Sequence, residues 1–443
     1  MNDHGSLAKA GLAVALAMVV FIGLTLVVNL GMFDEKPLEP VSRLMAPEYG
    51  VEPPREGNAY FALLGLKADE ERDMAASGAR LLERYARSQA ALGDADYLEI
   101  LGNLVADQAW LEAYDGCTGR KQAGCLKHFA EQIQSHPLGG ERLNLLLQRY
   151  GQIIDLPLFR DQEHLGMATP LPEYSAMMKL SQLQLANSFL SGNSAAFLDR
   201  LEADIRFWRM LLDQSRSLLG KMVGLAGIWN DVSFLSEFVA AQDSLDGHQA
   251  VISRILSPLT PGELDIGESF VFEQRFFVFD LVNNPGSALR RLLLQPQATV
   301  NSYYSLITGP MLRLSSLPLE EFVDTYIPAR DSEAGSAQLT STAGLLSLSP
   351  ASLYNLGGKQ ILVENAYSPA DYVARAHDAN GMIDLVKLQV WLKNQPEANW
   401  AQAVQNASIG NPYKQAPMSY DEEGPWLSFE CLDRLASCRV RLR

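Results

Sequence analysis

The 443-residue chain lacks the short motifs that mark the common enzyme classes. It contains no GxSxG, no HExxH, no P-loop and no GxGxxG after a strand. These absences argue against elbow-type serine hydrolases, zincins and nucleotide-dependent enzymes. We therefore predict no catalytic residue set, no cofactor and no metal. An enzyme whose catalytic residues are dispersed along the chain remains the alternative.

Cysteine and histidine are scarce, with four and six residues. The cysteines form two local pairs, Cys117 with Cys125 and Cys431 with Cys438, and their spacings fit no CxxC-type zinc pattern. We predict two disulfides in an oxidising compartment, with reduced core thiols as the alternative. In the chain-entropy model, a disulfide that closes so short a loop stabilises the fold by about 2.5 kcal/mol.

The chain has fewer basic than acidic residues. Against 36 lysines and arginines stand 52 aspartates and glutamates, a formal net charge of −16, and no window gathers basic residues into a stripe. Nucleic acid is therefore not expected as a partner. The same acidity argues against a body that lies flat on anionic lipid, so membrane attachment is expected from a single helix alone.

That helix is the most distinctive stretch present. Residues 10–30 read AGLAVALAMVVFIGLTLVVNL, with no charge between Lys9 and Asp34. At about 1.5 Å per residue, some 20 such residues span a bilayer core of roughly 30 Å. We predict a transmembrane helix over residues 10–32 that acts as an uncleaved signal anchor. The alternative is a cleaved secretory signal, but no small-x-small cleavage site follows.

The flanking charges indicate the orientation. Lys9 and the α-amino group precede the helix, whereas Asp34, Glu35 and Lys36 follow it. This pattern places the N-terminus inside the cell. Residues 1–9 are then a cytoplasmic stub, and the body lies in the periplasm.

The rest of the chain divides into segments that differ in composition and in apolar periodicity. Residues 33–57 contain five prolines and are predicted to be a tether. Residues 58–330 show helical periodicity and form the predicted periplasmic domain, residues 331–358 form a low-complexity loop, and residues 359–443 form a C-terminal α+β lobe. Its last segments, PMSYDE, WLSFECL and CRVRLR, predict a small β-hairpin or a three-stranded end piece.

Two apolar stripes at helical spacing predict a helical hairpin. Leu180, Leu183 and Phe189 belong to the first and Phe197 and Trp208 to the second, with SGNS between them. Asn193 or Ser194 is the expected N-cap of the second helix. The hairpin resembles a tetratricopeptide unit, but no second copy follows at a 34-residue period. The predicted fold class is therefore mainly α, with a non-repeating helical-hairpin body.

His377, with Asp378 and Asp384 on one predicted helix, is the best acid-base candidate, because a carboxylate can fix the tautomer of a histidine. An exposed ion pair is the alternative, and it is the one we favour.

A second candidate pair is Glu268 and Glu273, which lie among phenylalanines on a segment that could be irregular or extended. Buried ion pairs with Arg275 or other basic residues are favoured there. Cys125 beside His128 is better explained by a disulfide than by a nucleophile.

The chain resembles a group of uncharacterised bacterial single-pass inner-membrane proteins with a helical periplasmic domain. The stretches that carry this resemblance are NAYFALLGL (58–66), FWRMLLDQSRSLLGKMVGLAGIWNDVSFLSEF (207–238), RAHDANGMIDLVKLQVWL (375–392) and NPYKQAPMSYDEE with WLSFE (411–430). The resemblance implies anchoring and compartment, and no site residue. The last stretch also resembles the C-terminal end of type II secretion pseudopilins, but the hydrophobic segment lacks their Gly-Phe cleavage junction and glutamate.

The function expected from these features is that of a membrane-anchored periplasmic protein that binds another envelope protein. The anchor, the tether, the helical hairpin and the missing catalytic motifs all favour it. A periplasmic hydrolase with dispersed residues and a divergent secretion-system subunit are the alternatives.

Overall fold

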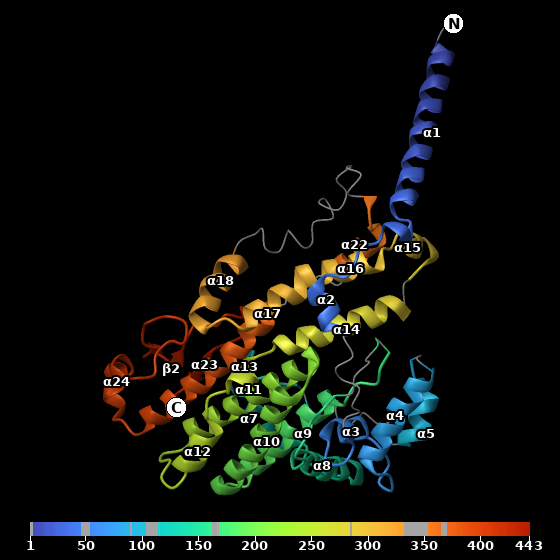
Figure 1. Ribbon diagram of the computed structural model, residues 1–443. Helices are drawn as coiled ribbons and strands as arrows, with labels where there is room; N and C mark the ends of the chain where they lie inside the picture. Colours follow the sequence, from blue (N-terminus) through green and yellow to red (C-terminus); the bar gives the residue numbers. More distant parts are fainter. Residues whose placement is uncertain are drawn as a thin grey trace. The chain divides into compact units, whose positions relative to one another are not determined.

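The computed structural model describes residues 3–45, 54–88, 91–102, 114, 116–161, 166, 168–283, 286–331, 353–364 and 370–443. The chain is mainly helical (Figure 1). It divides into two compact units. Unit 1 comprises residues 1–50, 273–314 and 324–369, and unit 2 comprises residues 51–272, 315–323 and 370–443. Each unit thus combines segments that are distant in sequence, whereas the predicted domains are contiguous ranges.

Unit 1 begins with the predicted apolar helix. Helix α1 (Asp3–Val28) contains an uncharged stretch, Gly11–Val28, that is long and apolar enough to cross a membrane. The helix ends four residues before the predicted limit of the span. Directly after it, the side chain of Asn29 forms hydrogen bonds with a distant segment, and a short 3-10 helix, η1 (Gly31–Phe33), follows.

Part of the predicted tether belongs to the core of unit 1. Helix α2 (Glu39–Leu44) buries Val41, and Arg275 Nε donates to the Leu44 carbonyl at 2.8 Å. Residues 46–53 of the tether lie outside the described residues. The other helices of unit 1 are α15 (Ala288–Leu292), α16 (Pro296–Tyr303), the π-helical turn η3 (Tyr304–Thr308), α17 (Gly309–Ser315) and α22 (Leu356–Glu364).

Two helices continue from one unit into the other along the chain, α14 (Gly267–Asn283) and α18 (Leu319–Asp331). Of the predicted low-complexity loop at 331–358, residues 332–352 lie outside the described residues.

Unit 2 contains the large apolar core, to which most of its helices contribute. Its helices are α3 (Ala59–Leu64), α4 (Met74–Ser88), α5 (Asp94–Leu101), α7 (Cys125–Ser135), α8 (Glu141–Ile154), α9 (Tyr174–Leu190), α10 (Ser194–Gln214), α11 (Leu218–Ala241), α12 (Gln249–Ile255), α13 (Pro261–Leu264), α23 (Ala370–Lys393), η4 (Glu397–Asn399) and α24 (Trp400–Asn406).

The predicted hairpin is formed by α9 and α10. Asn193 is the N-cap, and its side-chain oxygen accepts a hydrogen bond from the Ala196 N–H at 3.1 Å. Phe197 and Trp208 are fully buried on the inner face of α10, which packs against α11. The apolar periodicity therefore identified the helices and the turn between them.

The C-terminal segments form a three-stranded antiparallel sheet in the order β1-β2-β3, with β1 at Ser419–Asp421, β2 at Trp426–Ser428 and β3 at Arg439–Arg441. Leu427 pairs with Val440, and both are buried. Strand β3 packs against α11 and α23. The predicted small β element is confirmed.

Candidate functional site

A cavity of about 550 Å³ lies within unit 2 between helices α7, α9 and α11 and strands β2 and β3. We call its buried apolar lining residues, which include Leu126 and Val440, the floor, and its exposed lysine and arginines the rim. The residues that line it are Gly119, Ala123, Gly124, Leu126, Lys127, Phe189, Ser233, Ser236, Glu237, Ala240, Ala241, Trp426, Arg439, Val440, Arg441 and Arg443.

Small residues create the space. On the wall that α11 forms, four of the lining side chains are Ser233, Ser236, Ala240 and Ala241. Gly119 lies close to the same helix, because a Cβ atom there would come within 2.4 Å of Ser233 Oγ. The chain is held at this approach by a hydrogen bond from the Gly119 N–H to Asn230 Oδ1 at 2.9 Å.

Glu237 completes the wall and holds the start of α7. Its carboxylate accepts hydrogen bonds from the backbone N–H groups of Gly124, Leu126 and Lys127 at 3.1 to 3.2 Å. Burial raises the pKa of Glu237, and these hydrogen bonds counteract that rise. Because its oxygens already cap the first turn of α7, Glu237 is a structural group here.

The rim is cationic although the chain as a whole carries a net charge of −16. The guanidinium of Arg439 lies 4.8 Å from the centre of the Trp426 ring. Arg443 forms an ion pair with Glu397, and Lys127 Nζ lies 3.7 Å from Glu131 Oε1. Within the part of the chain that the structure describes, no ion pair involves Arg439 or Arg441.

The two predicted disulfides, Cys117–Cys125 and Cys431–Cys438, are both present. The loop that the first disulfide closes contributes Gly119, Ala123 and Gly124 to the cavity, and β3 begins directly after the second.

The two disulfide-bonded loops also contact each other. Arg120 forms an ion pair with Asp433, and the Ser437 N–H donates to the Arg120 carbonyl at 2.8 Å. Both covalent loops therefore support the walls of the cavity.

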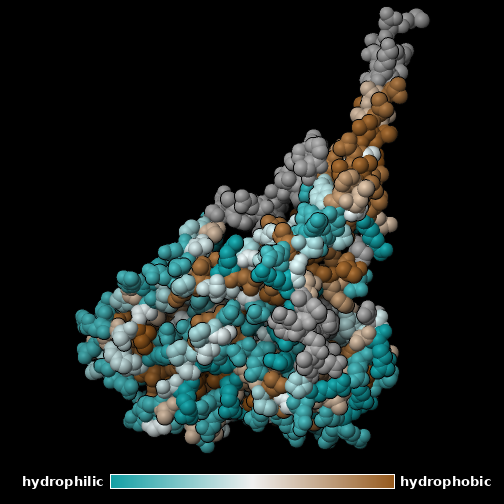
Figure 2. Space-filling model, viewed as in Figure 1, coloured by the Kyte–Doolittle hydropathy of each residue, from teal (hydrophilic) through white to brown (hydrophobic). Residues whose placement is uncertain are grey.

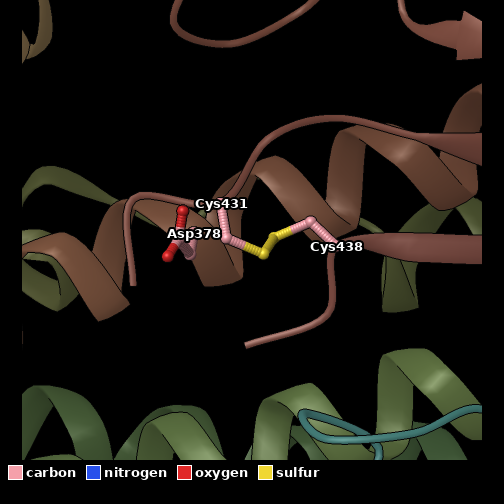
Figure 3. Close-up of side chains that lie close together, drawn as sticks. All are labelled: Asp378, Cys431 and Cys438. Atoms are coloured by element: carbon pink, nitrogen blue, oxygen red, sulfur yellow. A yellow bond between two sulfur atoms is a disulfide. The ribbon is translucent and has the colours of Figure 1, made fainter. Parts of the chain in front are cut away.

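Asp378 lies beside the Cys431–Cys438 disulfide, as Figure 3 shows. One of its carboxylate oxygens and both sulfurs lie within 4.8 Å of one another, which is close enough for a metal site. The two sulfurs are bonded to each other, however, and a disulfide offers no thiolate ligand.

Asp378 instead organises the loop around it. It accepts hydrogen bonds from the Tyr413 hydroxyl at 2.6 Å and from the N–H groups of Leu432 and Asp433, both at 2.8 Å. Burial raises the pKa of Asp378 to about 6, and these hydrogen bonds limit the rise.

The structure does not bring the predicted acid-base trio together. His377 packs its ring against Phe322 with the centroids 5.0 Å apart, and burial lowers the pKa of His377 to about 4. Asp378 is bonded to the disulfide loop, and Asp384 pairs with Lys387 at 2.8 Å. The favoured exposed ion pair is also wrong for His377, because at neutral pH this imidazole is uncharged and partly buried.

The two glutamates do not form a pair either. Glu268 and Glu273 lie on helix α14, so the segment is neither irregular nor extended. Five residues along a helix turn the side-chain direction by about 140°, so the two carboxylates point apart. Cys125 is disulfide-bonded, and the ring of His128 contacts Gln132 Nε2 at 3.1 Å.

A buried polar cluster in the core of unit 2 was not predicted from the sequence. The hydroxyls of Tyr150 and Ser181 both donate to Asp204, and Asp204 and Asp231 are fully buried. Burial raises the pKa of Asp204 and holds the pKa of Asp231 well above its usual range, with the charge of Asp204 adding to the second effect. The sequence signal was an aspartate on an apolar helix face, between Leu201 and Trp208.

No family model, no curated protein and no solved structure matches this chain.

Proposed function

We propose that this protein is a single-pass membrane protein whose unit 2 binds, in the cavity beside β3, an acidic segment of another envelope protein. The observation that supports this most strongly is a cavity with an apolar floor and an arginine rim in a chain of net charge −16. Helix α1 supplies the anchor, and the two disulfides are compatible with the oxidising periplasm.

The lining residues define the chemistry of the partner. Leu126, Phe189 and Val440 offer apolar contacts for one or two large side chains. Arg439 and Arg441 lie on one face of β3 and can each bind a carboxylate through two parallel hydrogen bonds. A segment that combines apolar and acidic residues fits both features.

The edge of the sheet favours an extended segment. Among the described strands, β3 pairs with β2 alone, because it is the last strand in the order β1-β2-β3. Residues 438, 440 and 442 face β2, so the backbone of Arg439 and Arg441 faces away from it. Gln389 Nε2 already donates to the Arg441 carbonyl at 2.6 Å. An incoming strand would therefore bond mainly to Arg439 and to the Arg441 N–H.

Binding explains the lining better than hydrolysis does. Among the described residues of the cavity wall there is no histidine and no free thiol. The carboxylate of Glu237 already accepts three backbone N–H groups, so it is not placed to serve Ser233 or Ser236 as a general base.

Site-specific photocrosslinking in cells tests the binding role. A benzophenone amino acid would replace Ala240 in the cavity wall or, as the control, Leu435, which is 71% exposed outside the cavity. We expect an adduct from position 240 only. Mass spectrometry should place it on an acidic, partly apolar segment of one envelope protein.

The charge requirement is tested in the same assay. The double variant Arg439→Glu with Arg441→Glu should abolish the adduct, because it converts attraction into repulsion. Arg206→Glu, on the exposed face of α10 and outside the cavity, is the matched control and should leave the adduct unchanged. An adduct that survives the double reversal, or one on a neutral or basic segment, would overturn the proposal.

The compartment is tested separately. A phosphatase fused after Arg443 should be active if unit 2 lies in the periplasm, and a reporter that works only in the cytoplasm should be silent there. The opposite pattern would overturn the proposed placement.

A further inference from the structure

The base of the anchor helix is built into unit 1. Directly after α1, the buried side chain of Asn29 donates to the Leu353 carbonyl and accepts from the Asn355 N–H, both at 2.7 Å. Gln295 Nε2 donates to the Leu30 carbonyl at 3.1 Å. The chain therefore enters the body of unit 1 within two residues of the end of α1.

The following residues continue this attachment. Asp34 caps α16 by accepting hydrogen bonds from the N–H groups of Gln297 and Ala298 at 3.0 and 2.9 Å. Asn301 Oδ1 accepts from the Leu38 N–H at 3.1 Å. Since residues 29–38 are bonded in this way, they cannot act as a free spacer between α1 and unit 1. The surface of unit 1 around the base of α1 must lie close to the bilayer that α1 crosses.

That surface exposes several large apolar side chains. In η1, Met32 is 80% exposed and Phe33 is 51% exposed, and in α15 Leu289 and Leu292 are 66% and 52% exposed. Figure 2 shows hydrophobic surface along α1 and again near the place where Figure 1 draws the end of α14, with hydrophilic residues between the two. The end of α14 adds Val282, which is 68% exposed.

The short helices η1 and α15 both contact one segment of unit 1. The Tyr354 hydroxyl donates to the Phe33 carbonyl at 3.1 Å, and the Gly357 N–H donates to the Leu293 carbonyl at 2.8 Å. One segment, residues 354–357, therefore holds both η1 and the end of α15. Arg290 and Arg291 lie between the two exposed leucines of α15, and basic and apolar residues are combined in this way in interfacial helices.

We propose that η1 and α15 form a membrane-contact face of unit 1, which lies in the headgroup region of the bilayer. The occupant of this face is the lipid surface, because η1 follows directly after the helix that crosses it. Met32, Phe33, Leu289 and Leu292 enter the boundary of the acyl chains, and Arg291 reaches the lipid phosphates. The inference rests on the anchoring role of α1 in the proposed function. It adds a second attachment to the single helix expected from the acidic composition.

Spin labelling of the full chain tests this face. All four native cysteines are in disulfides, so a new cysteine is the only thiol available for a nitroxide. The protein would be reconstituted in vesicles of phosphatidylethanolamine and phosphatidylglycerol with the label at Leu289→Cys or Leu292→Cys. Phe21→Cys in α1 is the lipid reference, and Leu435→Cys in unit 2 is the aqueous reference.

Collision rates with oxygen, which concentrates in lipid, and with a water-soluble nickel complex measure the surroundings of each label. We expect labels at 289 and 292 to resemble the label at 21, with more oxygen contact and less nickel contact than at 435. Labels at 289 and 292 that behave like 435, while 21 reports lipid, would overturn the inference and leave the anchor intact. Labels shielded from both reagents would also overturn it, because a protein surface would then cover the face. An aqueous signal at 21 itself would refute the anchor.

Discussion

Asp378 provides a quantitative test of the structure, because its buried carboxylate titrates in an accessible range. Burial raises the pKa of this group from 3.8 to about 6. In the unfolded chain the same carboxyl has a pKa of about 3.9. Between these two values the folded protein holds a proton that the unfolded chain has already released. The folded state is therefore favoured at the acidic end of this window, and the contribution is lost as the pH rises through 6.

The magnitude follows from the size of the shift. One pKa unit corresponds to about 1.4 kcal/mol, so a shift of about two units makes the unfolding free energy fall by about 3 kcal/mol between about pH 4 and pH 7. The Asp378→Asn variant has no carboxyl at this position and lacks this contribution. It also replaces the oxygen that accepts from the Asp433 N–H by an amide nitrogen, which costs about 1–3 kcal/mol at every pH.

The informative quantity is thus the difference in unfolding free energy between wild type and Asp378→Asn as a function of pH. Urea unfolding of the full chain in detergent, followed by tryptophan fluorescence, measures it. All other carboxyls titrate in both proteins and cancel in the difference. We expect the difference to fall by about 3 kcal/mol from about pH 4 to pH 7. A flat difference would show that the pKa is not raised, and a rising one would show that the hydrogen bonds outweigh burial.

Three further substitutions test the cavity wall, the buried cluster and the base of the anchor. Asp231→Asn should raise the unfolding free energy above neutral pH in urea titrations, since burial holds the pKa of Asp231 well above its usual range and the variant has no carboxyl to keep protonated there. A loss of stability above neutral pH would contradict this. Gly119→Ala should lower the unfolding free energy by about 1–3 kcal/mol, because the added methyl group would clash with Ser233. The control Gly116→Ala should be neutral, because a methyl group there would contact no atom within 4 Å. Equal effects of the two substitutions would refute the close approach of Gly119 to α11. Asn355 has a left-handed φ of 54°, and its side chain accepts a hydrogen bond from the Gln295 N–H. Asn355→Ala should therefore speed amide hydrogen exchange in residues 30–38 about tenfold or more, and Asn355→Gly should do so less, because glycine adopts this φ without strain. Unchanged exchange would argue against the hydrogen-bonded attachment of residues 29–38 to unit 1.

Local features of the sequence determined the type of most elements. The uncharged run before Asp34 predicted the apolar helix α1, and stripes at 3.6-residue spacing predicted α9 and α10 with Asn193 at the turn. The disulfides were also predictable, because each joins cysteines seven or eight residues apart. In each case the partners are near neighbours in the chain, so their spacing alone carries the information.

The candidate sites depend on contacts between residues that are far apart in sequence. The cavity is formed where Gly119, α11 and β3 meet, and none of its lining residues was predicted as a site. Asp378 is bonded to the loop 54 residues further on, and this contact removed it from the predicted trio with His377. The sequence shows which side chains are polar or apolar, but only tertiary packing decides which of them are buried and which partners they meet.

The base of the anchor also shows the difference between what the sequence predicts and what tertiary packing decides. Asn29 is one of two polar side chains in residues 10–30, and the predicted span of residues 10–32 placed it inside the membrane, with residues 33–57 as a tether. In the folded chain Asn29 bonds to Asn355, 326 residues away, and Asp34 caps α16. A polar side chain at the end of an apolar helix is compatible with water, lipid headgroups or a protein partner. The choice among these is a property of the folded chain, because a buried polar group needs hydrogen-bond partners that only the tertiary structure brings to it.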